Sequence, residues 1–227
     1  MKMPFSGTVA KSPQCAQHAY SISPGRHIIK LHRTFACLLL LLVGAGCGRG
    51  AGNPLPESIN DKSLFIGDSI TYFWEFPKHN VGVSGQTTEE IESRFQAAVL
   101  QSGLPQVIIL TGANDIRVLS PDYSGIMTNI QKMVAQARAI GVDVILCELT
   151  PITCCNTQVL TLNAMIRNYA ATQNLTLVDY YTPMAGKDAI YLKDGLHPNA
   201  LGYAIMENVL TQTLGRSEEK MPVVPTL

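Results

Sequence analysis

Ser69, Asp194 and His197 are residues whose types, taken together, suit nucleophilic chemistry. A serine hydroxyl is a weak nucleophile until a nearby base takes its proton. His197 can take that proton through Nε2, while Asp194 can accept a hydrogen bond from Nδ1–H and stabilise the charged ring. Asp194 and His197 are three positions apart in "DGLHP", on a predicted turn that leads into a helix, so their side chains can face one way. This set predicts acyl transfer to the serine hydroxyl.

The choice of base is narrow, because only two histidines follow Cys47 in the chain, His79 and His197. His79 precedes the predicted strand 81–83. The length of that strand should keep His79 away from the strand's carboxyl end, where the other candidate residues are expected. His197 is therefore the candidate base.

An acyl-transfer site also needs hydrogen-bond donors for the oxyanion of its tetrahedral intermediate. The backbone N–H groups of Ser69 and Gly85 and the side-chain amide of Asn114 can supply three donors. One such donor is typically worth about 10²–10³ in rate. Glycine suits position 85 because a Cβ there would obstruct the approach of the oxyanion to the backbone. We therefore expect Ser69, Gly85 and Asn114 to form the oxyanion hole.

Each of these residues also has an ordinary structural interpretation when it is considered alone. Serine is favoured as a helix N-cap, so Ser69 by itself fits a cap. Gly85 fits a turn with positive φ, and Asn114 fits a turn or a cap. Asp194 fits a turn and His197 fits a helix start. Only the occurrence of all five together favours the chemical interpretation.

The segments that must position these residues alternate between strand-like and helix-like patterns. Apolar, β-branched runs such as "QVIIL" and "VDVILCEL" suit strands buried on both faces of a parallel sheet. The alternation predicts βαβ units around a central five-stranded parallel sheet. In such a sheet, ligands bind beyond the carboxyl ends of the strands, where all five candidate residues would meet. The predicted strands are 63–66, 81–83, 107–110, 142–149 and 175–178, and the predicted helices are 87–100 (opened by the capping-box pattern Thr87-x-x-Glu90), 121–141, 158–173 and 199–214.

Four blocks of the chain resemble, in order, the motifs of the SGNH hydrolases, also called the GDSL family. The blocks are "GDSI" with Ser69, "NVGVSGQT" with Gly85, "GANDI" with Asn114, and "DGLHP" with Asp194 and His197. The resemblance covers roughly residues 61–214 and implies a flavodoxin-like, three-layer α/β/α fold. It also implies hydrolysis of esters or thioesters without a cofactor or a metal. The departures from the family pattern, Ile70 and Ala113, touch no catalytic group, and the G-x-S-x-G elbow of the α/β-hydrolases is absent.

The substrate class stays open between an acyl ester such as a lysophospholipid, an acyl thioester and an O-acetylated sugar. Tyr72, Phe73 and Trp74 are candidates to line the substrate pocket, with packing in the core as the alternative. A second hypothesis is a non-catalytic envelope binding module that keeps the fold. It predicts the loss of the serine, asparagine or histidine of the four blocks, and all three are present.

The amino-terminal part has the charge and hydropathy pattern of an export signal. Before Cys47 there are five Lys/Arg and no acidic residue, and Lys30 and Arg33 precede an apolar run, 36–46. The run is too short for a membrane span, which needs roughly 20 apolar residues, and it fits a signal peptide. "VGAGC" resembles a lipobox, which implies a lipid and a membrane anchor on Cys47, although Gly44 stands where leucine is usual. Plain secretion is the alternative.

We therefore divide the chain into a signal segment (1–46), a tether (47–60), a hydrolase domain (61–214) and a flexible tail (215–227). The signal predicts a protein exported to the cell envelope or beyond it. The part after Cys47 carries more acidic than basic residues, which argues against a nucleic-acid partner. The cysteines of that part, Cys147, Cys154 and Cys155, match no zinc-site spacing.

Overall fold

A computed structural model describes residues 55–219 of the 227-residue chain. The predictions for residues 1–54 and 220–227, including the signal segment and Cys47, lie outside the described residues. The elements follow the predicted alternation of strands and helices. In chain order they are α1 (Glu57–Asn60), β1 (Ser63–Gly67), α2 (Ser69–Tyr72), α3 (Thr88–Ser102), β2 (Gln106–Leu110), α4 (Tyr123–Ala139), β3 (Asp143–Cys147), the 3-10 helix η1 (Thr153–Cys155), α5 (Asn156–Thr172), β4 (Thr176–Val178), α6 (Asp188–Tyr191) and α7 (Ala200–Glu219).

A parallel sheet in the order β1-β2-β3-β4 forms the centre of the described residues. Its register pairs Gly67 with Leu110 and Cys147 with Val178. The residues that follow the four strands therefore lie along one border of the sheet, which we call the carboxyl edge. β1 is buried throughout, and β2 and β3 are buried except at their first residues, as expected for strands covered on both faces.

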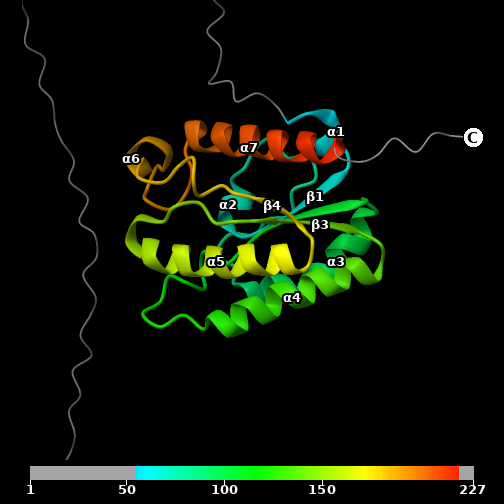
Figure 1. Cartoon of the computed structure of the whole chain (residues 1–227), viewed down its shortest axis with the longest axis horizontal. Helices are drawn as coiled ribbons and strands as arrows, with labels where there is room; N and C mark the ends of the chain where they lie inside the picture. Colours follow the sequence, from blue (N-terminus) through cyan, green and yellow to red (C-terminus); the bar gives the residue numbers. More distant parts are fainter. Residues whose placement is uncertain (1–54, 220–227) are drawn as a thin grey trace, which may run out of the picture. The chain divides into compact units, whose positions relative to one another are not determined.

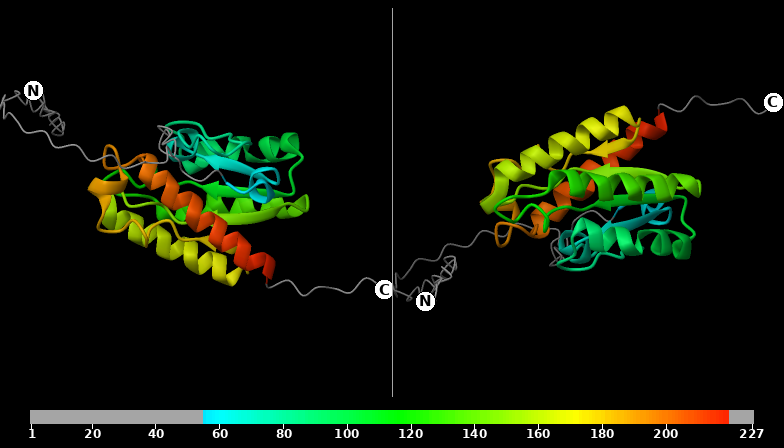
Figure 2. Two further views of the ribbon diagram at one scale, coloured as in Figure 1. Left: turned by 90° about the horizontal axis from the view of Figure 1, so that it is seen from above. Right: turned by 90° about the horizontal axis from the view of Figure 1, so that it is seen from below.

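Helices cover both faces of the sheet, so the described residues form three layers (Figure 1). α7 covers one face, and Figure 2 shows it running diagonally across the strands. α3, α4 and α5 cover the other face, where α3 packs against α4 and α5 contacts β3 and β4. This is the α/β/α arrangement that the resemblance implies.

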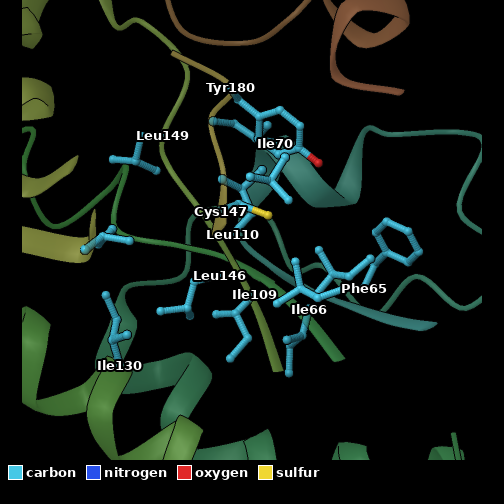
Figure 3. Close-up of a cluster of buried hydrophobic side chains, with 14 of the residues drawn as sticks. Phe65, Ile66, Ile70, Ile109, Leu110, Ile130, Leu146, Cys147, Leu149 and Tyr180 are labelled. Carbon is cyan, nitrogen blue, oxygen red and sulfur yellow. The ribbon is translucent and has the colours of Figure 1, made fainter. Parts of the chain in front are cut away.

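The apolar side chains of the strands fill the space between the layers (Figure 3). Ile66 and Ile109 of the two neighbouring strands are at most 1% exposed, and Ile130 of α4 packs in the same cluster.

The start of α3 is stabilised by hydrogen bonds between residues that are close in the sequence. In the predicted capping box, the Thr87 side chain accepts the Glu90 N–H and the Glu90 carboxylate accepts the Thr87 N–H, and both hydrogen bonds are present. The sequence pattern at this helix start is confirmed.

The predicted strand 81–83 is not a strand in the structure. The Val81 N–H donates to the Phe65 carbonyl at 2.9 Å, so the segment lies beside β1. Its only bridge to β1 joins Phe65 and Asn80. The Val83 N–H also donates to the Gly67 carbonyl at 3.1 Å, and the Asn80 side chain accepts the Gly82 N–H at 2.9 Å, but no continuous ladder forms. The described residues therefore form a sheet of four strands rather than five.

Two predicted boundaries also differ from the structure. Leu55 and Ile59 are 4% and 5% exposed, so the last residues assigned to the tether 47–60 belong to the packed domain. α7 continues to Glu219, past the predicted domain end at 214 and into the predicted tail 215–227. A single glycine, Gly215, weakens a helix without ending it, because its penalty relative to alanine is only about 1 kcal/mol.

Candidate active site

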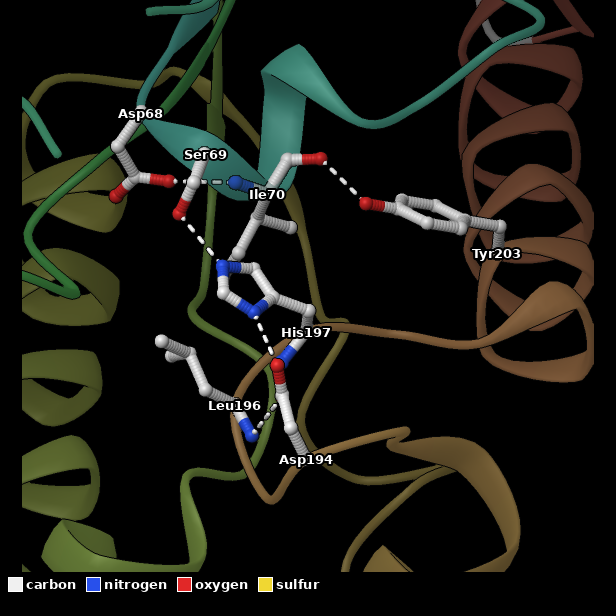
Figure 4. A network of polar contacts seen from close by, with 7 residues as sticks. All are labelled: Asp68, Ser69, Ile70, Asp194, Leu196, His197 and Tyr203. Atoms are coloured by element: carbon white, nitrogen blue, oxygen red, sulfur yellow. Dashed lines mark hydrogen bonds and ion pairs between the residues drawn. The ribbon is translucent and has the colours of Figure 1, made fainter. Parts of the chain in front are cut away.

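Ser69 lies at the corner where β1 ends and α2 begins. Asp68 alone separates the strand from the helix, so Ser69 is the first residue of α2. It is 5% exposed, and its hydroxyl faces the His197 ring (Figure 4). The strand direction thus delivers the serine to the carboxyl edge, as the sequence predicts.

Asp68, and not Ser69, is the N-cap of α2. Its Oδ1 accepts the Ile70 N–H at 2.9 Å, while Oδ2 forms no hydrogen bond. The interpretation of Ser69 as a cap is therefore wrong, and the Ser69 side chain is not used to cap α2. Burial raises the pKa of Asp68 to about 7, against the lowering effect of the Ile70 and Ala113 amides.

His197 joins Ser69 to Asp194 through its two ring nitrogens. The Nε2 atom is 2.9 Å from Ser69 Oγ, and Nδ1 is 2.7 Å from Asp194 Oδ2. The ring comes from the loop before α7, 128 residues away from Ser69 in the sequence. An ionised Asp194 can accept hydrogen bonds but cannot donate them. The proton between the two residues is therefore on Nδ1, which leaves Nε2 free to accept the serine proton.

The Asp194 carboxylate is held by its own loop. Its Oδ1 accepts the backbone N–H groups of Leu196 and His197 at 3.1 and 2.7 Å. Burial raises the pKa of Asp194, but hydrogen bonds from the His197 ring and from these two amides outweigh burial and lower it to about 2. The carboxylate therefore stays charged at any pH at which His197 can act as a base.

Asn114 and Gly85 lie in the loops that follow β2 and the segment beside β1. Asn114 Nδ2 donates to the Gln86 carbonyl at 2.9 Å, which ties the two loops together. An amide nitrogen has two hydrogens, so this bond orients the group and leaves one donor free. Gly85 has φ +85°, and a Cβ built on it meets no atom within 4 Å. The space beside Gly85 is open, as an approaching oxyanion requires.

Asp115 makes a second connection between these two loops. Its carboxylate accepts the Thr88 N–H at 3.0 Å and the Thr88 hydroxyl at 2.7 Å. The loop after β2 is thereby joined to the start of α3, close to Gln86. These bonds give Asp115 a structural role.

The family of the chain is settled by a match to the model of the GDSL-like lipase/acylhydrolase family, which spans residues 65–205. The chain belongs to this family. The match contains Ser69, Gly85, Asn114, Asp194 and His197. The protein is accordingly an esterase of the SGNH type, and the expected family and enzyme class are confirmed.

Solved structures agree with this family assignment. The chain is 29% identical to a GDSL-like lipase from Bacteroides thetaiotaomicron, with a TM-score of 0.64 over 74% of this chain and 94% of that chain. It shares its fold with an acetylxylan esterase from Geobacillus stearothermophilus (19% identity, TM-score 0.60, 67% of this chain and 93% of that chain). A carbohydrate esterase family 3 protein from Talaromyces cellulolyticus is similar in fold as well (18% identity, TM-score 0.59, 70% of this chain and 98% of that chain). No curated protein matches the chain by sequence.

The three aromatic residues after Ser69 divide between surface and core in this GDSL esterase. Tyr72 and Phe73 are 56% and 40% exposed, and the Phe73 ring packs edge-on against the His197 ring with centroids 5.3 Å apart. Trp74 is 2% exposed and donates its indole N–H to Glu207 Oε1 at 3.0 Å. Trp74 is therefore a core residue, and its prediction as a pocket residue is wrong.

A cavity of about 430 Å³ lies beside Phe73, whose ring packs on His197, and Pro198, the residue after His197, while Ser69, Gly85, Asn114, Asp194 and His197 do not line it. Phe73 and Phe76 contribute apolar surface, and Lys193, the residue before Asp194, contributes a charge. The Lys193 ammonium lies 4.6 Å from the centroid of the Phe73 ring, a cation–π arrangement that holds both side chains at the cavity. The cavity is lined by Phe73, Glu75, Phe76, Lys193, Pro198, Asn199, Ala200 and Tyr203.

Tyr203 of α7 is a supporting residue that the sequence interpretation did not identify. Its hydroxyl donates to the Ile70 carbonyl at 2.8 Å and so fixes α2 against α7 (Figure 4). Because Ser69 precedes Ile70, this bond holds the serine corner. A tyrosine on the buried side of a predicted helix signals such a bond, since a buried hydroxyl needs a partner, but its target cannot be found from sequence.

Metal and membrane features were also sought within residues 55–219. No three His, Cys, Asp or Glu side chains there converge as ligands for a metal ion. Nor does that part of the chain contain a helix long and apolar enough to cross a membrane.

Proposed function

We propose that the protein hydrolyses carboxylic esters through a covalent acyl-enzyme intermediate on Ser69. The observation that carries the proposal is the pair of contacts made by His197, 2.9 Å to Ser69 Oγ and 2.7 Å to Asp194 Oδ2. These distances fall within the range required of a nucleophile, its base and the group that orients the base.

In the first half-reaction, His197 Nε2 takes the Ser69 proton as Oγ forms a bond to the ester carbonyl carbon. The Ser69 and Gly85 backbone N–H groups and the free Asn114 amide hydrogen stabilise the oxyanion. The bond between the carbon and the alcohol oxygen then breaks, and His197 passes its proton to the leaving alkoxide. Asp194 stabilises the charged imidazolium while this takes place.

In the second half-reaction, water takes the place of the alcohol. His197 removes a proton from water as the oxygen attacks the acyl carbon, and the same three donors hold the second oxyanion. The bond to Ser69 Oγ breaks, the serine regains its proton, and the carboxylic acid leaves. Each half-reaction uses the same base, so a single histidine suffices.

For the substrate, we propose a short acyl group, such as acetyl, on a polyhydroxylated alcohol. The cavity beside His197 combines the rings of Phe73 and Phe76 with the polar side chains of Glu75, Lys193 and Asn199. Flat apolar rings with a few polar groups around them suit a sugar, which has apolar faces and hydroxyl edges. The two carbohydrate esterases of the same fold support this choice.

The proposal is tested with p-nitrophenyl esters from acetate to palmitate, together with acetylated xylo-oligosaccharides, a lysophospholipid and an acyl thioester. We expect kcat/KM to be highest for acetate and the acetylated sugar to be deacetylated. A fluorophosphonate should label Ser69 and abolish turnover. Absence of both labelling and turnover would exclude a serine esterase, whereas a maximum at long acyl chains would replace the sugar ester by a lipid.

We also propose that the protein is exported and carries a lipid on Cys47, on the basis of the apolar run and the lipobox-like segment. When the full chain is produced in a bacterial host, it should partition into the detergent phase of Triton X-114. Intact mass should show a processed chain that begins with a lipidated Cys47. A Cys47→Ala chain should stay in the aqueous phase. Equal partitioning of both chains would contradict lipidation and leave plain secretion.

A further inference from the structure

Cys154 and Cys155 form a close thiol pair at the carboxyl edge. Their Sγ atoms are 2.9 Å apart, both thiols are free, and the Cys154 side chain is exposed. The peptide bond that joins them is trans. By contrast, Cys147 in β3 is 2% exposed, and burial raises the pKa of its thiol far above the ordinary value. Of the three cysteines within residues 55–219, the adjacent pair is the one open to reagents in solution, because reactivity requires access.

The thiol pair adjoins the loop that carries Asp194. Thr153, the residue before Cys154, donates its N–H to the Gly195 carbonyl at 2.9 Å. Its hydroxyl donates to Asp188 Oδ2 at 3.0 Å, so Thr153 connects η1 to both α6 and the Asp194 loop. Gly195 has φ +80°, and a Cβ built on it would lie 3.1 Å from Thr153 Oγ1. There is little free space between the two loops, so a shift of one is transmitted to the other.

The charge of Arg117 also acts on the pair. Burial and the neighbouring Cys154 raise the pKa of the Cys155 thiol to about 11, and the positive charge of Arg117 opposes them. Arg117 is therefore near enough to act on Cys155, and it lies three residues after Asn114. The thiol pair is thus linked to the Asp194 loop through its neighbour Thr153, and Cys155 is within electrostatic range of Arg117.

We propose that Cys154 and Cys155 form a reversible vicinal disulfide that slows ester hydrolysis by displacing the Asp194 loop. This regulation rests on the proposed function, whereas the formation of the disulfide does not. The oxidant belongs to the class of disulfides, either a small molecule or a protein.

The chemistry is a thiol–disulfide exchange in two steps. The exposed Cys154 thiolate attacks one sulfur of the external disulfide, and the first external thiolate leaves and takes up a proton. The Cys155 thiolate then attacks Cys154 Sγ in the mixed disulfide, and the second external thiolate leaves and is protonated. Two protein thiols are oxidised to one disulfide, and one external disulfide is reduced to two thiols.

The geometry of adjacent residues makes such a bond easy to reverse. Neighbouring Cα atoms are about 3.8 Å apart across a trans peptide, whereas ordinary disulfides join Cα atoms about 4.4–6.8 Å apart. The ring closed by two adjacent cysteines is therefore strained. Strained and exposed disulfides are reduced more readily than structural ones, which suits a reversible modification.

Bond formation must also move the backbone of η1. The sulfur atoms have to approach from 2.9 Å to about 2.05 Å, and the Cys155 N–H bond to the Ile152 carbonyl lies within the turn that has to adjust. Thr153 moves with this turn and takes the Gly195 carbonyl with it. A misplacement of about 1 Å can lower a rate about 100-fold, so we expect the smaller shift to lower kcat about 10-fold.

The test compares the full chain after dithiothreitol with the full chain after glutathione disulfide, using p-nitrophenyl acetate. We expect kcat to fall about 10-fold on oxidation with little change in KM, and to recover when dithiothreitol is added. Tandem mass spectrometry should show a loss of two hydrogen atoms on the segment that contains Cys154 and Cys155. Cys154→Ser and Cys155→Ser should keep the activity of the reduced protein and lose the response, while Cys147→Ala should keep both.

The outcomes separate the two proposals. A reduced protein that neither turns over the ester nor reacts with a fluorophosphonate contradicts the proposed function, whatever the thiols do. An active protein on which only glutathione adducts form contradicts the disulfide. If the disulfide forms and kcat stays the same, the regulation is wrong. A response that persists in the Cys154→Ser/Cys155→Ser double variant assigns the effect to other cysteines and overturns the proposal.

Discussion

The two ends of the sheet each carry a cavity, but only the carboxyl edge carries the candidate active site. The amino end carries the larger cavity, about 640 Å³, lined among others by Lys62, Gln106 and Asp143. The carboxyl edge carries a cavity of about 430 Å³ beside His197. Only the carboxyl edge also brings a nucleophile, a base and oriented donors together. Volume alone therefore does not identify the functional end, whereas converging polar groups do.

The two ends also differ in how their buried polar groups are satisfied. At the amino end, the buried Ser63 hydroxyl donates to Gln106 Oε1 at 2.7 Å. Past the carboxyl ends of β1, β2 and β3, the structure leaves the side-chain oxygens of Asp68 (Oδ2), Thr71, Thr111 and Thr150 without a hydrogen-bond partner. These oxygens therefore lack the kind of protein partner that the Ser63 hydroxyl has at the amino end.

The largest expected effect comes from removing the base. His197→Ala should lower kcat by about 10⁶-fold, because Ser69 then has no proton acceptor. Lys62→Ala, at the larger cavity, is the matched control and should leave kcat unchanged. Steady-state kinetics with p-nitrophenyl acetate and a thermal melt of each variant make the comparison. Near-full activity of a folded His197→Ala protein would exclude this triad.

Removal of one oxyanion donor should have the next largest effect. Asn114→Ala should lower kcat by about 10²–10³-fold with little change in KM, because the donor acts mainly on the transition state. The kinetic parameters are measured with the same ester. A change confined to KM would instead assign Asn114 to substrate binding.

The buried Asp68 carboxyl at the carboxyl edge should make the stability of the protein depend on pH. Its pKa is raised from 3.8 to about 7 in the folded protein, so the folded state binds more protons than the unfolded state between these values. The free energy of unfolding should therefore fall as pH rises from about 4 to about 7. The shift sets an upper limit of about 4 kcal/mol, and relaxation around the ionised carboxylate should reduce it to about 2 kcal/mol.

Asp68→Asn tests this pH dependence because asparagine still caps α2 but does not titrate. Urea unfolding at pH 5 and pH 8 should show a smaller pH slope in the variant and a higher stability than the parent at pH 8. Identical slopes in the two proteins would show that ionisation of Asp68 does not weaken this edge.

The smallest expected effect is a change in KM when a lysine is removed from one of the two cavities. Lys193→Ala should raise KM for an acetylated sugar about 3-fold, since it removes one polar contact of about 0.5–1.5 kcal/mol. Lys62→Ala should not change KM. Equal effects of the two substitutions would mean that the cavity beside His197 does not bind the alcohol portion.

Local features of this fold were predictable because they depend on neighbours in the sequence. The apolar runs predicted β1 to β4, and the Thr87 and Glu90 pattern predicted the start of α3. The spacing of Asp194 and His197 within one turn predicted their contact. Parallel strands place their carboxyl ends along one edge, so even the meeting of distant residues at that edge followed from the pattern.

Other features depend on contacts between segments that are far apart, and the pattern misjudged them. The segment 81–83 was predicted as a strand, but it lies beside β1 with only two hydrogen bonds to it, from Val81 and Val83, and one isolated bridge, at Asn80. For Trp74 the sequence left a pocket role and packing in the core open. The Trp74 indole meets Glu207 of α7, 133 residues away, which no local pattern reports.

The sequence by itself determined the residue types of the site, the order of the elements and the family, because these depend on composition, periodicity and short motifs. The tertiary structure alone decided that Asp68 caps α2 and that Tyr203 holds the serine corner. It also decided that Thr153, the residue before the adjacent cysteines, is bonded to the Asp194 loop. Such contacts arise when helices and loops pack, and packing depends on shapes that no single segment of sequence contains.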